Sequence, residues 1–273
     1  MPVRPELSAT RALACLYCPP RQRALLEALC ALEREIGASL APGLDHQVAH
    51  TRLVWWREEC VRCEQGEPVH PLTRELAGLC GSTGVLAGLT GFIDTAVWDL
   101  AAATFQTRRE LQAYCERWSA AMIEPWARWA APALEPAQVR GLGCDLRETE
   151  LLLALAAEAR AGRLRLPLAE LEHTHVEPEE LAQPPWRPAL AGLVRERHGQ
   201  LRAALTAGIA ALPASARAAL RGMAVWAAIA AAQSRRAEAK LPQANITGDS
   251  RAPLDGWRAW RAARRALAGG VPT

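Results

Sequence analysis

The chain is 273 residues long, with 50% hydrophobic and 22% charged residues, which excludes an intrinsically disordered or collagen-like protein. Alanine, leucine and arginine dominate the composition, and this mixture favours helices over an all-β fold. The net charge is only +3, from 32 basic and 29 acidic residues. Such a weak overall field argues against nucleic acid as a partner.

No segment of the sequence predicts a membrane-spanning helix. The longest uncharged apolar run, residues 222–232, falls well short of the ~20 residues that a spanning helix needs. The first twenty residues lack the long apolar region of a secretory signal. We therefore expect a cytoplasmic protein, with any contact to the inner membrane being peripheral. Its 8 cysteines are then expected to be reduced thiols.

Apolar residues at spacings of three and four predict a series of helices, which proline and glycine delimit. In chain order the predicted helices cover residues 20–40, 45–65, a segment that begins at 71, 92–103, 108–130, 136–161, 186–211, 214–240 and 254–268. Residues 166–185 are predicted to be irregular, and 241–253 to form a loop. Strand patterns and internal repeats are absent from the sequence. We predict an all-α, single-domain helical bundle of residues 1–273, with its core in 15–268.

Two Cys-x-x-Cys pairs, Cys15 with Cys18 and Cys60 with Cys63, each have the spacing of half a zinc site. The gap between the two pairs is about twice the gap in a zinc ribbon. Moreover, Cys60 and Cys63 continue the apolar helix stripe that contains Trp56. We interpret these cysteines as buried free thiols.

The chain contains 10 tryptophans against 2 phenylalanines and 2 tyrosines. The adjacent Trp55 and Trp56 face different sides of their predicted helix, so one is expected in the core and the other at a rim or interface. The last predicted helix is amphipathic, and one of its faces carries Trp257, Trp260, Arg261, Arg264 and Leu267. We expect this helix to dock both tryptophans on the bundle and to leave its arginines in water. The alternative is contact with anionic lipid headgroups.

Several segments resemble, in the same order, motifs of the squalene/phytoene synthase family. They are PPRQRALLEAL from Pro19, RLVWWREEC from Arg52, GEPVHPLTREL from Gly66, FIDTAVWDL from Phe92, ELQAYC from Glu110 and GRLRLPLAELE from Gly162. The resemblance extends over about residues 15–265. It implies the isoprenoid synthase fold, a helical bundle around a deep apolar central cavity, which agrees with the predicted helices.

Enzymes of this family hold Mg²⁺ on two Asp-rich clusters, because a hard cation takes oxygen ligands and neutralises the departing diphosphate. When the chain is aligned on residues 34–36, the first cluster falls on Gly37, Ala38 and Ala41. When it is aligned on residues 162–163, the second falls on Ala154, Ala157 and Glu158. Only the last of these carries a carboxylate. The resemblance thus implies a degenerate catalytic site with no metal and no other cofactor.

Other acidic residues offer two interpretations. Asp145, Glu148 and Glu150 either form a rebuilt metal site or are first-turn and surface acids paired with nearby arginines. We favour the second interpretation, and we apply it also to Glu33 and Glu35.

The resemblance also supplies candidate ligand-binding residues. Asp94 and Asp99 match family positions, and Tyr114 belongs to the Tyr-Cys motif. Three arginines flank Gly162, at the position where the family places the diphosphate end of the pocket, and could bind an anion: Arg160, Arg163 and Arg165.

The loss of both clusters, beside an intact Trp-Trp-Arg and His-Pro region, is most similar to the family branch of the mitochondrial complex I assembly factor. We therefore predict a catalytically degenerate protein that binds a lipid or isoprenoid, or that acts on a protein partner as an assembly factor. The alternative is an active prenyltransferase with a rearranged metal site, which would require Mg²⁺.

Overall fold

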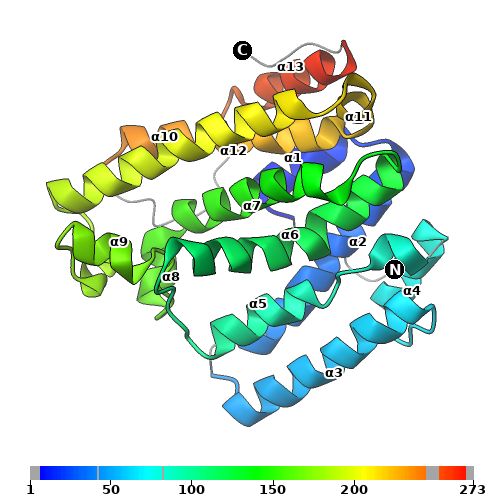
Figure 1. Ribbon diagram of the computed structural model, residues 1–273, viewed down its shortest axis with the longest axis horizontal. Coiled ribbons are helices and arrows are strands. Elements are labelled where there is room, and N and C mark those ends of the chain that lie inside the picture. The colour runs from blue at the N-terminus through cyan, green and yellow to red at the C-terminus, as the bar shows by residue number, and fades with distance from the viewer. Residues whose placement is uncertain (1–6, 42, 82, 244–251, 269–273) are drawn as a thin grey trace.

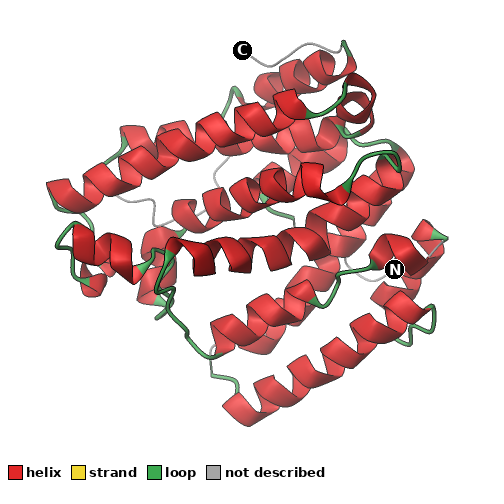
Figure 2. Cartoon of the chain, viewed as in Figure 1, coloured by secondary structure: helices red, strands yellow, loops and turns green. Residues whose placement is uncertain are grey.

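The computed structural model describes residues 7–41, 43–81, 83–243 and 252–268 (Figure 1). Within these ranges the chain forms α-helices and short 3₁₀-helices and no strand (Figure 2). The all-α prediction is confirmed. Most of the loop predicted over 241–253, namely 244–251, lies outside the described residues.

The helices in chain order are α1 (Ala9–Leu16), α2 (Pro20–Gly37), η1 (Ala38–Leu40), α3 (His46–Gln65), α4 (Pro71–Cys80), η2 (Thr83–Leu86), α5 (Gly91–Leu100), α6 (Arg108–Ala130), α7 (Pro136–Leu153), α8 (Leu155–Arg160), α9 (Leu168–His173), η3 (Pro178–Ala182), α10 (Pro188–Ala211), α11 (Ala214–Ala219), α12 (Arg221–Ala239) and α13 (Asp255–Leu267). Proline starts several of them, where its missing amide hydrogen costs no helical bond. The Asp45 side chain caps α3 by accepting from two backbone amides, and Gly66 ends that helix with a φ of +88°.

Two predicted helices are broken in the structure. The helix predicted over 136–161 divides at Ala154 into α7 and α8, and the one predicted over 214–240 divides at Leu220 into α11 and α12. Alanine and leucine are good helix formers, so neither break has a local signal. Tertiary contacts produce at least the first break, because α8 turns to pack on η3. The segment predicted to be irregular contains α9 and η3.

The helices stack in layers (Figure 1). The pair α6 and α7 lies in the middle, with α10 and α12 on one side and α5 and α3 on the other. α13 packs on α12 at one edge of the bundle, and α3 lies at the opposite edge. The largest hydrophobic cluster joins residues of α1, α2, α6, α7 and α12.

α1 packs closely against α12, and one glycine permits this contact. A Cβ atom at Gly222 would lie 2.4 Å from the Cys18 sulfur and 2.9 Å from the Ala14 carbonyl oxygen. Both distances are too short for any larger residue. Gly222 therefore sets how near the N-terminal helix comes to the centre of the bundle.

The orientation expected for α13 is wrong. The helix docks on Val225 and Ile229 of α12 through a stripe of alanines (Ala259, Ala262, Ala263 and Ala266). Its tryptophans point outward, with Trp257 52% and Trp260 46% exposed. Alanine allows the two helix backbones to approach, so the bulky indole rings are excluded from this interface.

The predicted burial of side chains on α3 is confirmed. Trp56 is buried at 6% exposure, whereas Trp55 is 41% exposed at the rim. Cys60 and Cys63 are buried, as the apolar stripe predicted. Their thiol pKa values are raised, chiefly by burial, so both sulfurs are protonated at neutral pH.

None of the described helices is by itself long and apolar enough to cross a membrane. Pro71–Cys80 and Gly84–Leu100 meet the length and composition criteria only as a pair, and they are bent by 118° relative to each other.

Candidate functional site

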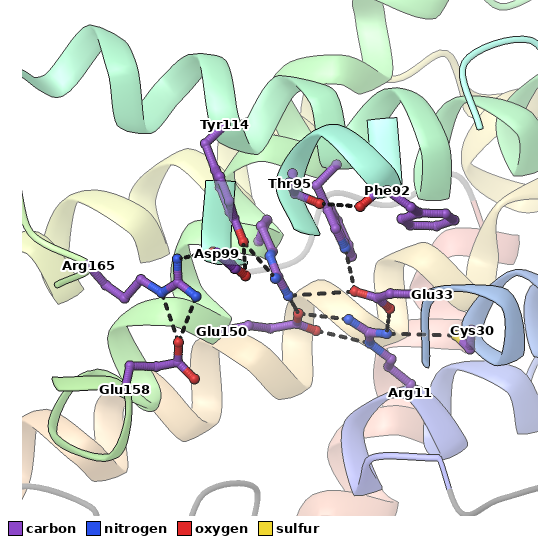
Figure 3. Close-up of polar contacts among 12 residues, drawn as sticks. Arg11, Cys30, Glu33, Phe92, Thr95, Asp99, Tyr114, Glu150, Glu158 and Arg165 are labelled. Atoms are coloured by element: carbon purple, nitrogen blue, oxygen red, sulfur yellow. Dashed lines mark hydrogen bonds and ion pairs between the residues drawn. The ribbon is translucent and has the colours of Figure 1, made fainter. Parts of the chain in front are cut away.

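Arg11 reaches from α1 into the middle of the bundle, where it meets carboxylates from two other helices (Figure 3). Its Nε and one terminal nitrogen donate to the two oxygens of Glu150 on α7, at 3.1 and 2.8 Å. Its other terminal nitrogen forms an ion pair with Glu33 on α2. A two-pronged guanidinium–carboxylate pair is among the stronger polar contacts in proteins. Arg11 therefore ties α1 to both α2 and α7.

A second arginine, Arg147 on α7, completes this group. One of its terminal nitrogens lies 3.3 Å from a Glu150 oxygen and 3.7 Å from a Glu33 oxygen. The guanidinium lies 5.4 Å from the centre of the Trp118 ring, and the Trp118 indole nitrogen donates to Glu33 at 2.6 Å. We call Arg11, Glu33, Trp118, Arg147 and Glu150 the central ion cluster.

The charges of the central ion cluster cancel, two guanidinium groups against two carboxylates. Burial alone would raise the pKa of Glu33, but the charges of Arg11 and Arg147 hold it below its usual value. Burial likewise disfavours the Arg11 cation, yet Glu150 and Glu33 raise the Arg11 pKa well above normal. Arg11 and Glu33 thus stay charged because their partners replace the water that they have lost.

Tyr114 links the central ion cluster to a second group of charges. Its hydroxyl accepts from Arg147 at 3.3 Å and donates to Asp99 on α5 at 3.1 Å. Arg165 bridges Asp99 and Glu158, at 2.7 Å from an oxygen of each. Glu158 also accepts from Arg163 at 2.9 Å. We call Asp99, Glu158, Arg163 and Arg165 the Glu158 cluster.

The two arginines that contact Glu158 strongly stabilise its ionised form. Burial would raise this pKa, but hydrogen bonding from Arg163 and the positive charge of Arg165 lower it to about 2. The carboxylate therefore has two cations as its permanent partners.

The positions that correspond to the two metal-binding clusters do not fit Mg²⁺. Those of the first cluster lie at the end of α2 and just beyond it, are largely exposed and have no side-chain oxygen: Gly37, Ala38 and Ala41. In the second, Ala154 and Ala157 offer none either. Within the described ranges, no three His, Cys, Asp or Glu side chains gather as a possible metal-ligand set. Mg²⁺ needs several oxygen ligands, and Glu158, the carboxylate among these positions, already faces two guanidinium groups.

The structure brings together four of the six candidate ligand-binding residues. Tyr114 and Arg165 both contact Asp99 (Figure 3), and Arg163 contacts Glu158 at 2.9 Å. Asp94 instead forms an ion pair of 2.5 Å with Arg57, in which both side chains are well exposed. The exposed Arg160 donates to the Ala182 carbonyl oxygen at 2.9 Å.

Of the acids interpreted as surface residues paired with arginine, Glu33, Glu148 and Glu150 are paired, but none of the three is fully exposed. Glu33 and Glu150 belong to the central ion cluster. Glu148 is buried and forms ion pairs with Arg108 and Arg197. Except for Arg147, which precedes Glu150 by three residues, these partners come from helices far away in sequence, so local spacing did not reveal them.

Sequence reasoning missed Arg11 and Arg147 altogether. Neither belongs to a motif of the family that the sequence analysis used, and Arg11 is 139 residues away from Glu150. One usable signal was present. An arginine on a short apolar helix, as in residues 9–16, requires a buried counter-ion if that face packs inward.

A family model described as squalene/phytoene synthase matches residues 5–258. The chain belongs to the squalene/phytoene synthase family. Among curated protein sequences, none matches.

Solved structures confirm the isoprenoid synthase type of fold. A dehydrosqualene synthase in complex with a ligand superposes with a TM-score of 0.73 at 17% identity, covering 95% of this chain and 90% of that one. The squalene synthase HpnC from Alicyclobacillus acidocaldarius gives a TM-score of 0.65 at 16% identity, covering 86% and 89%. At these identities the likeness concerns the fold and not the chemistry.

Proposed function

We propose that this chain is a catalytically degenerate member of the squalene/phytoene synthase family that uses the fold for binding or assembly. The observation that carries the proposal is the exchange of counter-ions. Where the family is expected to hold Mg²⁺ on carboxylates, this chain pairs its remaining carboxylate with its own arginines.

The energetics support this reading. Departure of a diphosphate requires positive charge that is free to meet it, and the loss of one such clamp costs several kcal/mol of transition-state stabilisation. Arg11 and Arg147 carry positive charge, but Glu33 and Glu150 already neutralise it. An incoming diphosphate would have to displace these carboxylates at buried positions, which is unfavourable.

The proposed ligand is an isoprenoid or another lipid, and a protein partner is proposed from the resemblance to the assembly-factor branch. The solved dehydrosqualene synthase with its bound ligand supports the first, because its fold accommodates a ligand. The absence of a cofactor and a peripheral place at the inner membrane stay predictions.

Pyrophosphate release tests the proposal. The purified chain is incubated with Mg²⁺ and either farnesyl or geranylgeranyl diphosphate, and a dehydrosqualene synthase serves as the positive control. We expect no release above the protein-free blank. Mg²⁺-dependent release that disappears in Glu158→Ala would contradict the proposal and support the alternative, a prenyltransferase with a rearranged metal site.

Thermal unfolding gives an independent measurement. A ligand that binds only the folded state raises the melting temperature. We expect no shift with millimolar Mg²⁺ and inorganic pyrophosphate, whereas an increase of several degrees would indicate a retained metal–diphosphate site.

Binding is tested separately by native mass spectrometry of the protein purified from cells. We expect a co-purifying lipid or isoprenoid mass. Recovery of the bare chain alone would argue against a retained ligand and leave the protein partner as the proposed role.

A further inference from the structure

A groove of about 220 Å³ lies between α10, α12 and α13, on the far side of the bundle from α3. Leu205 and Ile209 of α10, with alanines of α12, give it an apolar lining. Five arginines also line it: Arg217, Arg235, Arg258, Arg261 and Arg265. None of the described residues that line the groove is acidic. Arg258 pairs with Asp255, and the groove places the other guanidinium groups beside its apolar lining.

The outward face of α13 continues this charge with aromatic residues. The Arg261 guanidinium lies 4.4 Å from the centre of the Trp257 ring, and that of Arg264 lies 5.2 Å from Trp260. The only acid of α13, Asp255, is buried, and it is bound to arginines of α12 and α13. The negative charge of Asp255 is therefore paired inside the bundle and is not presented on the outward face of α13.

These two features favour a lipid surface. A helix that docks through alanine has no structural need for exposed tryptophans, and indole rings prefer the boundary between water and hydrocarbon. Arginines beside such rings attract anionic headgroups. Charge complementarity thus selects an anionic surface, and the apolar lining with the exposed rings selects one that contains hydrocarbon.

We propose that α13 and the adjoining groove, which we call the α13 surface, dock on a bilayer that contains anionic phospholipid. α13 lies parallel to the membrane plane, Trp257 and Trp260 enter the headgroup region, and Arg235 and Arg261, which line the groove, bind lipid phosphates. This proposal is independent of the proposed function, because it involves none of the residues of the central ion cluster.

Vesicle flotation tests the α13 surface. The purified chain is mixed with vesicles of phosphatidylcholine alone or of phosphatidylcholine with phosphatidylglycerol, at low and high salt. We expect flotation only with phosphatidylglycerol, weakened by salt. Arg235→Gln/Arg261→Gln is expected to lower the partition coefficient by roughly fivefold per arginine, and Trp257→Ala/Trp260→Ala to abolish flotation.

Matched controls remove the same residue types elsewhere. Trp55→Ala and Arg52→Gln/Arg109→Gln change exposed residues away from the α13 surface and are expected to float like the wild type. Circular dichroism melting verifies that each variant is folded. If the tryptophan variant does not fold, wild-type tryptophan fluorescence with brominated-lipid vesicles replaces it, and quenching is expected only when phosphatidylglycerol is present.

The contrary outcomes are equally definite. No flotation, equal flotation with both vesicle types, or equal losses in the control variants would overturn the proposal. Flotation that soluble glycerol phosphate abolishes at constant ionic strength would identify a site for a free phosphate ester instead of a bilayer. Failure with vesicles, combined with self-association that the tryptophan variant removes, would assign the face to a protein contact.

Discussion

Arginine is used in two opposite ways at the centre and at the edge of this molecule. In the central ion cluster each guanidinium pairs with the carboxylates of Glu33 and Glu150. These ion pairs join α1, α2 and α7. On the α13 surface the guanidinium groups of Arg261 and Arg264 lie over tryptophan rings, and none of the described residues that line the groove beside them is acidic. A carboxylate partner makes the guanidinium groups of Arg11 and Arg147 structural cross-links, whereas those of Arg261 and Arg264 contact tryptophan rings, although the residue type is the same.

The largest effect is expected from Arg11→Met. The change leaves Glu33 and Glu150 with Arg147 as their remaining shared cation and removes the polar anchor of α1. Breaking a buried ion pair by removing one partner costs about 3–5 kcal/mol. Urea unfolding should show this loss in the free energy of unfolding, while Arg261→Met should stay within about 0.5 kcal/mol of the wild type. A loss below about 1 kcal/mol for Arg11→Met would show that the cluster contributes little to stability.

A smaller and pH-dependent loss is expected from Glu158→Gln. The pKa of Glu158 is about 2 in the folded chain, below its usual value of 4.5, so its ion pairs stabilise the fold fully above pH 4.5. With allowance for partial exposure we expect a loss of about 2 kcal/mol at pH 7. Because the wild type loses this contribution as the pH falls from 4.5 towards 2, the two proteins should converge there. Denaturant titrations between pH 4.5 and 2 measure the free energy of unfolding of both proteins. A difference between them that does not change with pH would refute the ion pairs as its cause.

At Asp145, a partly buried residue of α7, removal of the charge is expected to raise the free energy of unfolding instead of lowering it. Burial, together with the charge of Glu148, raises the pKa of Asp145 from 3.8 to about 6. Its charged form therefore destabilises the fold above pH 6, and this cost disappears as the pH falls from 6 towards 3.8. Asp145→Asn should stabilise the protein by about 1–2 kcal/mol at pH 8 and by much less at pH 4. Melting curves of both proteins at pH 8 and pH 4 test this. Equal stabilisation by Asp145→Asn at the two pH values would indicate a packing effect.

The smallest effect is expected at the exposed pair of Arg57 and Asp94. Solvent screens both charges, so the double variant Arg57→Gln/Asp94→Asn should change the free energy of unfolding by no more than about 0.5 kcal/mol. A double-mutant cycle in urea measures the coupling between the two residues. Coupling above about 1 kcal/mol would remove the contrast between exposed and buried ion pairs in this chain.

The helices could be predicted because their apolar spacing and their delimiting prolines are local features. The breaks at Ala154 and Leu220 could not, because both residues favour helix. On α13 the pattern indicated an amphipathic helix but not which face packs. Here the alanine face, being the smaller, allows the closer approach to α12.

The candidate site was predictable only where a motif marked it. Asp99, Tyr114, Arg163 and Arg165 were found because each lies in a segment that resembles the family. Arg11 lies in no such segment, and its importance depends on partners that the fold alone brings near. Sequence patterns therefore indicated the residues that resemble the family, but not the buried cations Arg11 and Arg147.

The position of α1 also has a consequence for biosynthesis. Arg11 pairs with a residue 139 positions later, and α1 docks against Gly222, later still. Ribosomes add about 5–20 residues per second, so α1 is made on the order of ten seconds or more before its docking surface exists. During that interval the face of α1 that packs on α12 remains uncovered. The helix that is translated first among those described therefore reaches its native place only after α12 has been made, although the carboxylates that pair with Arg11 are present once α7 has been translated.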